Sequence, residues 1–383
     1  MKVLLVHNAY QFRGGEDAVV DAERSLLLRH GHQVIDYLRH NNELVAANRF
    51  KAATDTLWSA RTWAEIDALL AAERPDVMHA HNTFPQISPS LYWAASERSV
   101  PVVQTLHNFR LLCPQAMLLR KGRVCESCVG RTPLRGVLHG CYRGSRLATG
   151  ILASSLMLHR AAGTWANKVD RYIALNEFCR AKFVEGGLPA ERIKVKPNFV
   201  ELAAPAAAAR RGLLFVGRLS EEKGIGVLAD AARSIDADAI RVVGVGPAAS
   251  QLTGVLALVQ VGELESEEVA AEMARAVALV MPSICYENFP RTLVEAFACG
   301  LPVVASRLGA LAELVEDGVT GLHFEAGNAA DFASKMQWAL ANPGYMAEMG
   351  RTARRVYERL YTPEINYEQL MAIYREAIAL RAT

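Results

Sequence analysis

Short runs of apolar and β-branched residues alternate along the chain with longer stretches whose apolar residues recur at helical spacing. This alternation is typical of parallel sheets built from strand–helix–strand units. In the first half we expect strands at Val3–Val6, Val34–Tyr37, Val77–His79, Val102–Thr105 and Tyr172–Ala174. We expect helices between them at Ala18–Arg29, Trp63–Ala72 and Leu147–Ala166. The pattern restarts in the second half, with strands expected at Leu213–Val216, Ile240–Val243, Leu279–Met281 and Val303–Ala305.

The restart predicts two doubly wound α/β domains. An Ala/Pro tract at Ala203–Ala209 separates the two runs, and we interpret it as the connection between a first domain at residues 1–200 and a second at 201–362. The last helix, at residues 363–383, carries an apolar stripe made of Tyr367, Leu370, Met371, Tyr374, Ala377 and Ile378. Such a stripe must pack somewhere, either on its own domain or on the first.

Composition narrows the class of protein. The chain has 383 residues, 51% of them apolar, and 42 basic residues balance 40 acidic ones. A net charge of +2 excludes a protein that binds polyanions over its whole surface, so we expect no nucleic-acid partner. The first residues form neither a signal peptide nor a membrane span, so we expect a cytoplasmic protein whose seven cysteines serve as thiols or metal ligands rather than as disulfides.

Polar residues mark the carboxyl ends of the expected strands, where open parallel sheets bind ligands. Three ends in the first half carry the same dipeptide, as His7-Asn8, His81-Asn82 and His107-Asn108, and a fourth carries Asn176-Glu177. Each pair alone is explained equally well by hydrogen bonds to loop backbone. Three pairs on one edge favour a site, although the spacing is not that of a metal-binding helix.

Two loops have the residues needed to approach phosphate. Gly14-Gly15 opens the first helix, where missing side chains let a ligand reach the backbone. The loop at residues 217–224, with the sequence GRLSEEKG, places Arg218 and Lys223 together before a helix. Two fixed cations can neutralise a diphosphate, although a solvated surface pair is the alternative.

The segment 282–306 carries the strongest signal. A strand ends near Pro282, a polar loop carries Glu287, and Pro290 is expected to start a helix whose first amides can bind an anion. Glu295 lies in the apolar run LVEAFA, where an acid needs a partner. Two carboxylates eight residues apart can accept hydrogen bonds from neighbouring hydroxyls of one extended ligand.

These features together resemble family 4 of the retaining glycosyltransferases, over essentially the full chain. The resemblance rests on the Glu-x7-Glu motif from Glu287 to Glu295, the loop at 217–224, the Gly14-Gly15 loop and His107. It implies the GT-B fold, in which two Rossmann-like domains face each other across a cleft. It also implies a last helix that returns to the first domain, and a nucleoside diphosphate sugar as donor.

The resemblance further implies a role for each motif. Arg218 and Lys223 would hold the donor diphosphate, Glu287 would contact sugar hydroxyls, and His107 would lie beside the transferred sugar. Glu295 would bind the ribose. The remaining donor-site residues implied by the resemblance are Gly14, Gly15, Gly262, Leu264, Asn288, Phe289, Pro290 and Arg291.

A sugar–diphosphate bond breaks into an oxocarbenium-like centre and a charged leaving group, which fixed cations and helix amides can stabilise without a divalent ion. We therefore expect transfer without a metal ion, and the resemblance implies that it is retaining, with a hydroxyl acceptor and, by analogy, a place in surface polysaccharide or glycolipid assembly. Two alternatives stay open. Gly244–Pro247 mimics part of a dinucleotide fingerprint and would suit an NAD(P)-dependent oxidoreductase, and a non-catalytic protein that binds a nucleotide sugar would also carry these motifs.

A cysteine-rich insertion at residues 110–146 interrupts the first domain. Its thiols, Cys113, Cys125, Cys128 and Cys141, have the Cys-x2-Cys element of a structural zinc site. Unligated thiols or disulfides are the alternatives. The insertion is also basic, with eight Arg and Lys residues against the single acid Glu126, so we expect it to contact an anionic lipid-linked acceptor or the membrane surface unless it is only a solvated loop.

Overall fold

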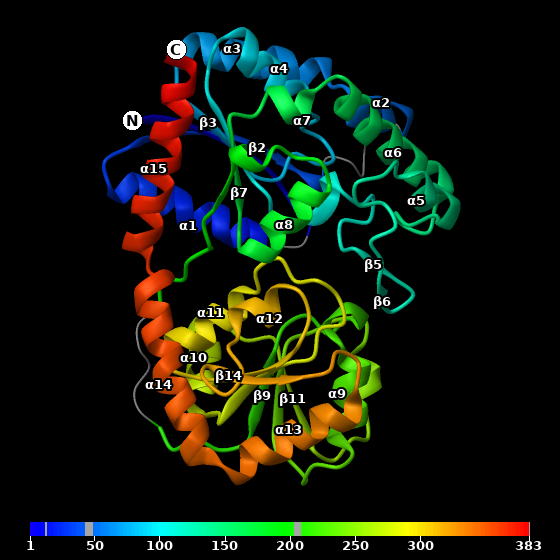
Figure 1. Ribbon diagram of the computed structural model, residues 1–383, viewed down its shortest axis with the longest axis vertical. Coiled ribbons are helices and arrows are strands. Elements are labelled where there is room, and N and C mark those ends of the chain that lie inside the picture. The colour runs from blue at the N-terminus through cyan, green and yellow to red at the C-terminus, as the bar shows by residue number, and fades with distance from the viewer. Residues whose placement is uncertain (12–13, 43–48, 203–207, 383) are drawn as a thin grey trace. The chain divides into compact units, whose positions relative to one another are not determined.

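The computed structural model describes residues 1–11, 14–42, 49–202 and 208–382, and its contacts divide them into two units (Figure 1). Unit 1 comprises residues 1–117, 126–198 and 366–383; unit 2 comprises residues 118–125 and 199–365. Residues 203–207 of the expected connection lie outside the described residues. No helix in the described ranges is long and apolar enough to cross a membrane.

The sheet of unit 1 has six parallel strands in the order β2-β1-β3-β4-β7-β8. They are β2 (Gln33–His40), β1 (Lys2–Ala9), β3 (Val77–Ala80), β4 (Val102–Thr105), β7 (Arg171–Ala174) and β8 (Ile193–Val195). Every residue of β3 and β4 is buried, as expected for central strands covered by helices on both faces. The strand order reverses direction after β1, which is the topology predicted from the alternating pattern.

Unit 1 surrounds this sheet with helices, visible in the upper part of Figure 1. They are α1 (Gly15–Arg29), α2 (Arg49–Leu57), α3 (Ala60–Glu73), α4 (Ser90–Glu97), α5 (Leu134–His139), α6 (Arg146–Ala161), α7 (Thr164–Asn167), α8 (Glu177–Glu185) and α15 (Pro363–Ala382). The single helix predicted at 147–166 is wrong, because Gly163 adopts a left-handed conformation with φ 68° and separates α6 from α7.

The last helix, α15, is held by its apolar side chains. Leu370, Met371, Ile373, Tyr374 and Ala377 belong to one core cluster with residues of β1 and β3. This burial of the apolar stripe accounts for the helix better than its intrinsic propensity does.

The sheet of unit 2 also has six parallel strands, in the order β11-β10-β9-β12-β13-β14. They are β11 (Leu258–Gly262), β10 (Ile240–Val243), β9 (Leu213–Val216), β12 (Ala278–Met281), β13 (Val303–Ser306) and β14 (Gly321–Phe324). Its helices are α9 (Ile225–Ala232), α10 (Ser266–Arg275), α11 (Arg291–Ala298), α12 (Ala310–Leu314), α13 (Ala329–Ala341) and α14 (Pro343–Leu360). The prediction of two doubly wound α/β sheets is confirmed.

A small hairpin lies within the cysteine-rich insertion. Its strands are β5 (Leu119–Arg120) and β6 (Arg123–Val124), which pair antiparallel around the turn at Lys121 and Gly122. Both turn residues have positive φ, at 51° and 69°, as a two-residue hairpin turn requires.

Candidate functional site

In unit 2, two loops meet at the carboxyl ends of the neighbouring strands β9 and β12. Gly224 has φ 73°, and a Cβ there would lie 1.8 Å from the carbonyl oxygen of Pro282. The backbone N–H of Ile284 also donates to the carbonyl of Glu222 at 3.0 Å. Only glycine at 224 permits this approach, so the loop at 217–224 and the loop after β12 form one surface.

An ion pair joins these two loops. Lys223 Nζ lies 2.7 Å from Glu287 Oε1, and the Ser283 hydroxyl donates to the same oxygen at 2.7 Å. Burial alone would raise the pKa of Glu287, but the charge and hydrogen bond of Lys223 and the Ser283 hydroxyl outweigh it and hold the pKa below its ordinary value. Glu287 is therefore a charged acceptor next to a fixed cation.

The helix after this loop, α11, begins at Arg291. Pro290 is its N-cap residue rather than its first helical residue, which corrects the expected start by one position. No capping side chain engages the first-turn amides within the described part of this segment. The Leu293 N–H already donates to the carbonyl of Pro290 at 3.0 Å, so the amides of Arg291 and Thr292 are the ones suited to bind an anion.

Glu295 lies inside α11 and has a local partner. Arg291 Nε lies 3.0 Å from Glu295 Oε1, one helical turn away. Burial nevertheless raises the pKa of Glu295 above its ordinary value, although Arg291 acts in the opposite direction. Phe289 is buried, and its ring packs against Tyr361 with centroids 5.8 Å apart.

Arg218 differs from Lys223. Its side chain is exposed, and no ion pair joins it to an acid among the residues that the structure describes. The loop at 217–224 therefore supplies one cation already engaged by Glu287 and another that faces solvent. An exposed arginine can form a bidentate contact with a phosphate.

The glycines that mimic a dinucleotide fingerprint have a packing role. A Cβ at Gly244 would lie 2.0 Å from the carbonyl oxygen of Gly217, and one at Gly246 would lie 2.3 Å from that of Leu219. Gly244 N–H also donates to Gly262, the last residue of β11, while Leu264 follows in the partly buried loop before α10. These contacts explain the glycines without a bound dinucleotide.

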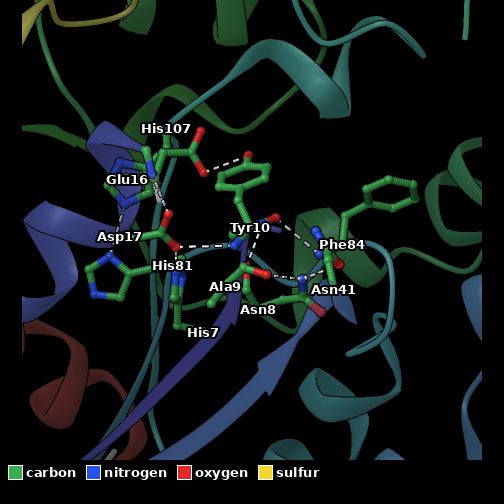
Figure 2. A network of polar contacts seen from close by, with 12 residues as sticks. His7, Asn8, Ala9, Tyr10, Glu16, Asp17, Asn41, His81, Phe84 and His107 are labelled. Carbon is green, nitrogen blue, oxygen red and sulfur yellow. Dashed lines mark hydrogen bonds and ion pairs between the residues drawn. The ribbon is translucent and has the colours of Figure 1, made fainter. Parts of the chain in front are cut away.

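In unit 1, the histidines of the three strand-end dipeptides come together (Figure 2). His81 Nδ1 lies 2.9 Å from His107 Nε2, and the rings of His7 and His81 pack edge to face with centroids 6.3 Å apart. His7 Nε2 is 2.8 Å from Asp17 Oδ1. Burial lowers the pKa values of His81 and His107, so both rings are neutral near pH 7.

The start of α1 lies beside these histidines. Gly14 is the N-cap, and its N–H donates to Asp17 Oδ2 at 2.7 Å. The position that a Cβ would take at Gly15 has no atom within 4 Å, so the backbone there is open to an approaching group. Glu16 accepts a hydrogen bond from the Tyr10 hydroxyl at 2.9 Å (Figure 2). It also accepts one from Asn108 Nδ2 at 3.0 Å, which links α1 to the loop after His107.

Within unit 1, Pro114, Cys128 and Cys141 of the cysteine-rich insertion contact Gly136, whereas residues 118–125 of the insertion belong to unit 2. A Cβ at Gly136 would lie 3.2 Å from Pro114, the neighbour of Cys113, and 3.8 Å from the Sγ of Cys128. The N–H of Cys141 donates to the carbonyl of Gly136 at 3.0 Å. Cys125, partly exposed, follows the hairpin and donates its N–H to Leu118 at 2.7 Å.

Comparison with known proteins finds two matching domain models. A model for group 1 glycosyl transferases matches residues 210–342, and a model for the glycosyl transferase 4-like domain matches residues 26–198. Both halves of the chain therefore match models of glycosyl transferase domains. A D-inositol 3-phosphate glycosyltransferase of Acidothermus cellulolyticus is 29% identical to this chain over 341 residues, covering 80% of the chain and 68% of the relative. Five other curated relatives are matched over only 16% to 46% of their own length.

Solved structures share the fold of this chain. Sucrose-phosphate synthase from Thermosynechococcus elongatus superposes with a TM-score of 0.72 at 19% identity, covering 99% of both chains. Anabaena HepE in complex with UDP has a TM-score of 0.68 at 18% identity, covering 97% and 99% of the two chains. At this identity the likeness concerns the fold alone, and it confirms the predicted GT-B class.

Several residues of the unit 1 site were not predicted from the sequence. Asp17 and Glu23 lie in α1, and Lys196 follows β8. Glu23 carried a detectable signal, because it lies on the same helical face as the buried Val19, Val20, Leu26 and Leu27. An acid on a buried face calls for a partner, but the sequence does not identify which one.

Proposed function

We propose that the chain is a metal-independent, retaining glycosyltransferase that moves a sugar from a nucleoside diphosphate sugar to a hydroxyl acceptor. The observation that carries this proposal is the Lys223–Glu287 pair, set beside uncapped helix amides at the carboxyl ends of β9 and β12. A lysine held by a carboxylate, an exposed arginine and helix amides without a side-chain cap together suit a diphosphate next to a sugar.

Each residue of unit 2 then has a role. Arg218, Lys223 and the amides from Asn288 to Arg291 would stabilise the diphosphate, while Glu287 would accept from sugar hydroxyls. Glu295 would accept from the ribose. Gly262 and Leu264 would lie against the base. In unit 1, Gly14, Gly15 and His107 would approach the phosphates and the transferred sugar.

The reaction breaks the bond between the anomeric carbon and the diphosphate oxygen. The acceptor oxygen forms the new bond on the same face, and its proton passes to the leaving phosphate. The charge that develops on the diphosphate is stabilised by Arg218, Lys223 and the amides of α11. No covalent sugar–enzyme intermediate is needed.

UDP-sugars are the first donors to test, because HepE binds UDP and UDP-glucose. We expect one nucleotide sugar in a thermal-shift panel of UDP-, GDP- and ADP-sugars to raise the melting temperature, and transfer to keep the donor's anomeric configuration by NMR. Glu287→Gln should lose transfer, with Glu313→Gln on α12 as a control variant. Stabilisation by NAD(P)H alone would instead favour the oxidoreductase.

We propose that the acceptor is anionic and lipid-linked, and that a basic, apolar patch brings unit 1 to the membrane surface. Leu134 and Leu138 on α5 and Leu147 on α6 are 53%, 67% and 78% exposed. The exposed arginines around them are Arg131, Arg135, Arg143 and Arg146, and residues 127–169 contain no acid. Exposed leucines flanked by arginines suit an anionic lipid surface, in which the leucines enter the headgroup boundary.

Vesicle binding tests this patch. The unchanged protein should co-sediment with phosphatidylglycerol-containing vesicles more than with phosphatidylcholine vesicles. Reversing the four arginines to Glu should weaken binding more than about 100-fold, since each basic residue near the surface contributes about 1 kcal/mol. The matched control reverses four exposed arginines of unit 2, which are Arg233, Arg275, Arg307 and Arg351. Unchanged binding of the patch variant would end this proposal.

We propose that Cys113, Cys125, Cys128 and Cys141 hold a structural zinc ion. The support is the Cys-x2-Cys spacing of Cys125 and Cys128, together with the contacts that Pro114, Cys128 and the Cys141 backbone make with Gly136. Four thiolates would fix an insertion too short to form its own core. Mass spectrometry of the purified protein should find about one zinc per chain, and less than about 0.2 would rule the site out.

A further inference from the structure

A sealed polar cluster lies behind His107. Its members are Glu23 of α1, His79 of β3, His81 after β3 and Lys196 after β8, all nearly or fully buried. Lys196 Nζ lies 2.7 Å from Glu23 Oε1 and donates to Asn366 Oδ1 at 2.9 Å. Asn366 in turn donates to the carbonyl of Pro197. Lys196 is thus fixed from two sides.

Glu23, His79 and His81 are close enough to bind a metal ion, but their partners do not suit one. His79 Nε2 is 2.8 Å from the Thr105 hydroxyl, and His79 Nδ1 is 2.8 Å from the Tyr374 hydroxyl. Both nitrogens of His79 are therefore in use. The Lys196 ammonium already neutralises the carboxylate that a cation would need.

The ion pair instead determines where the proton of His81 lies. Burial alone would raise the pKa of Glu23, but the charge and hydrogen bond of Lys196 hold it below its ordinary value, so the carboxylate is charged. Its Oε2 lies 3.5 Å from His81 Nε2, and neither atom has a hydrogen-bond partner in the described part of the chain. A neutral imidazole next to a carboxylate presents its N–H rather than its lone pair.

The state of His107 follows from that of His81. With the proton of His81 on Nε2, its Nδ1 is an acceptor, and the 2.9 Å contact requires His107 Nε2–H to donate. His107 is neutral because burial lowers its pKa, against the opposing charges of Glu16 and Glu23. The lone pair of His107 is therefore left on Nδ1.

We propose that the Lys196–Glu23 ion pair is a positioning element that acts through His81 to hold His107 in the Nε2–H tautomer. Nδ1 of His107 is thereby kept as an acceptor for a hydroxyl of the donor sugar. The contact between Nδ1 and the donor sugar rests on the proposed function, whereas the tautomer of His107 does not. Glu23, Lys196 and His81 are positioning residues, since they act on the substrate only through His107.

The tautomer is measured in the resting protein by long-range ¹H–¹⁵N NMR of the histidine rings, with the His107 signals assigned from His107→Gln. We expect a protonated Nε2 and an unprotonated Nδ1. A protonated Nδ1 in the unchanged protein overturns the proposal, whatever reaction the protein catalyses.

Two variants separate the ion pair from the rest of the core. Glu23→Leu with Lys196→Met removes both charges and should shift His107 towards the other tautomer, whereas an unchanged spectrum overturns the proposal. Tyr374→Phe is the matched control, because it removes a buried hydroxyl of the same cluster that contacts His79 rather than His81. It should leave the His107 signals in place.

His81 provides a second test that keeps both charges. His81→Asn can place an amide oxygen where Nδ1 accepts from His107, so it should keep the tautomer, while His81→Leu should lose it. If both variants lose the Nε2–H tautomer of His107, or if both keep it, the proposal is contradicted. With the donor sugar identified, His81→Leu should lower kcat up to about tenfold, since one hydrogen bond contributes about 0.5–1.5 kcal/mol, and His81→Asn should restore it. No turnover in the unchanged protein would count against the proposed function alone.

Discussion

Two lysine–glutamate pairs in this protein have the same 2.7 Å separation and opposite surroundings. The Lys196–Glu23 pair of unit 1 is 0% exposed on both sides, whereas the Lys223–Glu287 pair of unit 2 is 30% and 12% exposed. The distance between the charges therefore does not distinguish their roles. The roles of the two pairs are distinguished by their access to solvent and ligand.

The two environments predict different responses when one partner is lost. A sealed charge without its partner can neither turn to water nor change its contacts, so the remaining ion is left uncompensated. The partly open pair can rehydrate, and its lysine can exchange the carboxylate for a phosphate. We therefore expect the sealed pair to hold neighbouring side chains in place and the open pair to bind a ligand.

The largest expected effect is on stability in unit 1. Glu23→Leu leaves Lys196 charged and buried, and should lower the free energy of unfolding by about 3–5 kcal/mol. Glu287→Gln should lower it by at most about 1 kcal/mol. Urea denaturation followed by circular dichroism measures both. Lys196→Met added to Glu23→Leu should recover most of the loss, and equal losses for the two single variants would contradict the comparison.

The second largest expected effect is on the rate of sugar transfer, after substitution in the Lys223–Glu287 pair. Lys223→Met should lower kcat by about 10²- to 10³-fold, the size typical of losing one group that stabilises the developing charge, while unfolding changes little. Arg233→Met at the end of α9 removes an exposed cation of the same unit and serves as the control. A loss confined to the KM of the donor would show that Lys223 binds the ground state only.

The sequence predicted the open pair more readily than the sealed one. Lys223 and Glu287 lie in loops directly after strands, where their polarity stands out against the preceding apolar run. The four-residue strands β4, β9 and β10 were predicted to the residue for the same reason. Local contrast between apolar strand and polar loop is a property that a single sequence displays.

The sealed pair depends on distant contacts. Glu23 and Lys196 are 173 positions apart and meet only because β8 joins the sheet edge beyond β7. That strand was missed, as were β11 and β14, because a short edge strand lacks a long apolar run. The pairing of buried charges is thus set by sheet order, which the sequence pattern does not encode locally.

The smallest expected effect is on the melting temperature and concerns a third acid, Glu295. Its direction should be opposite to that of Glu287. Burial raises the pKa of Glu295 above its ordinary 4.5, so the folded state holds its proton longer than the unfolded state and stability falls as pH rises through the folded pKa. The pH dependence of stability has the opposite sign for Glu287. Its lowered pKa adds stability above the unfolded pKa, and this stability is lost as the pH falls.

Glu295→Gln should therefore raise the melting temperature at pH 7 by about 1–2 °C, and Glu287→Gln should lower it. Melting curves from pH 4 to pH 8 test this, and a shift of the same sign in both variants would show that burial does not separate the two carboxylates. If Glu295 binds the ribose, the stabilised Glu295→Gln variant should also bind the nucleotide more weakly, because an amide accepts a hydroxyl proton less strongly than a carboxylate does.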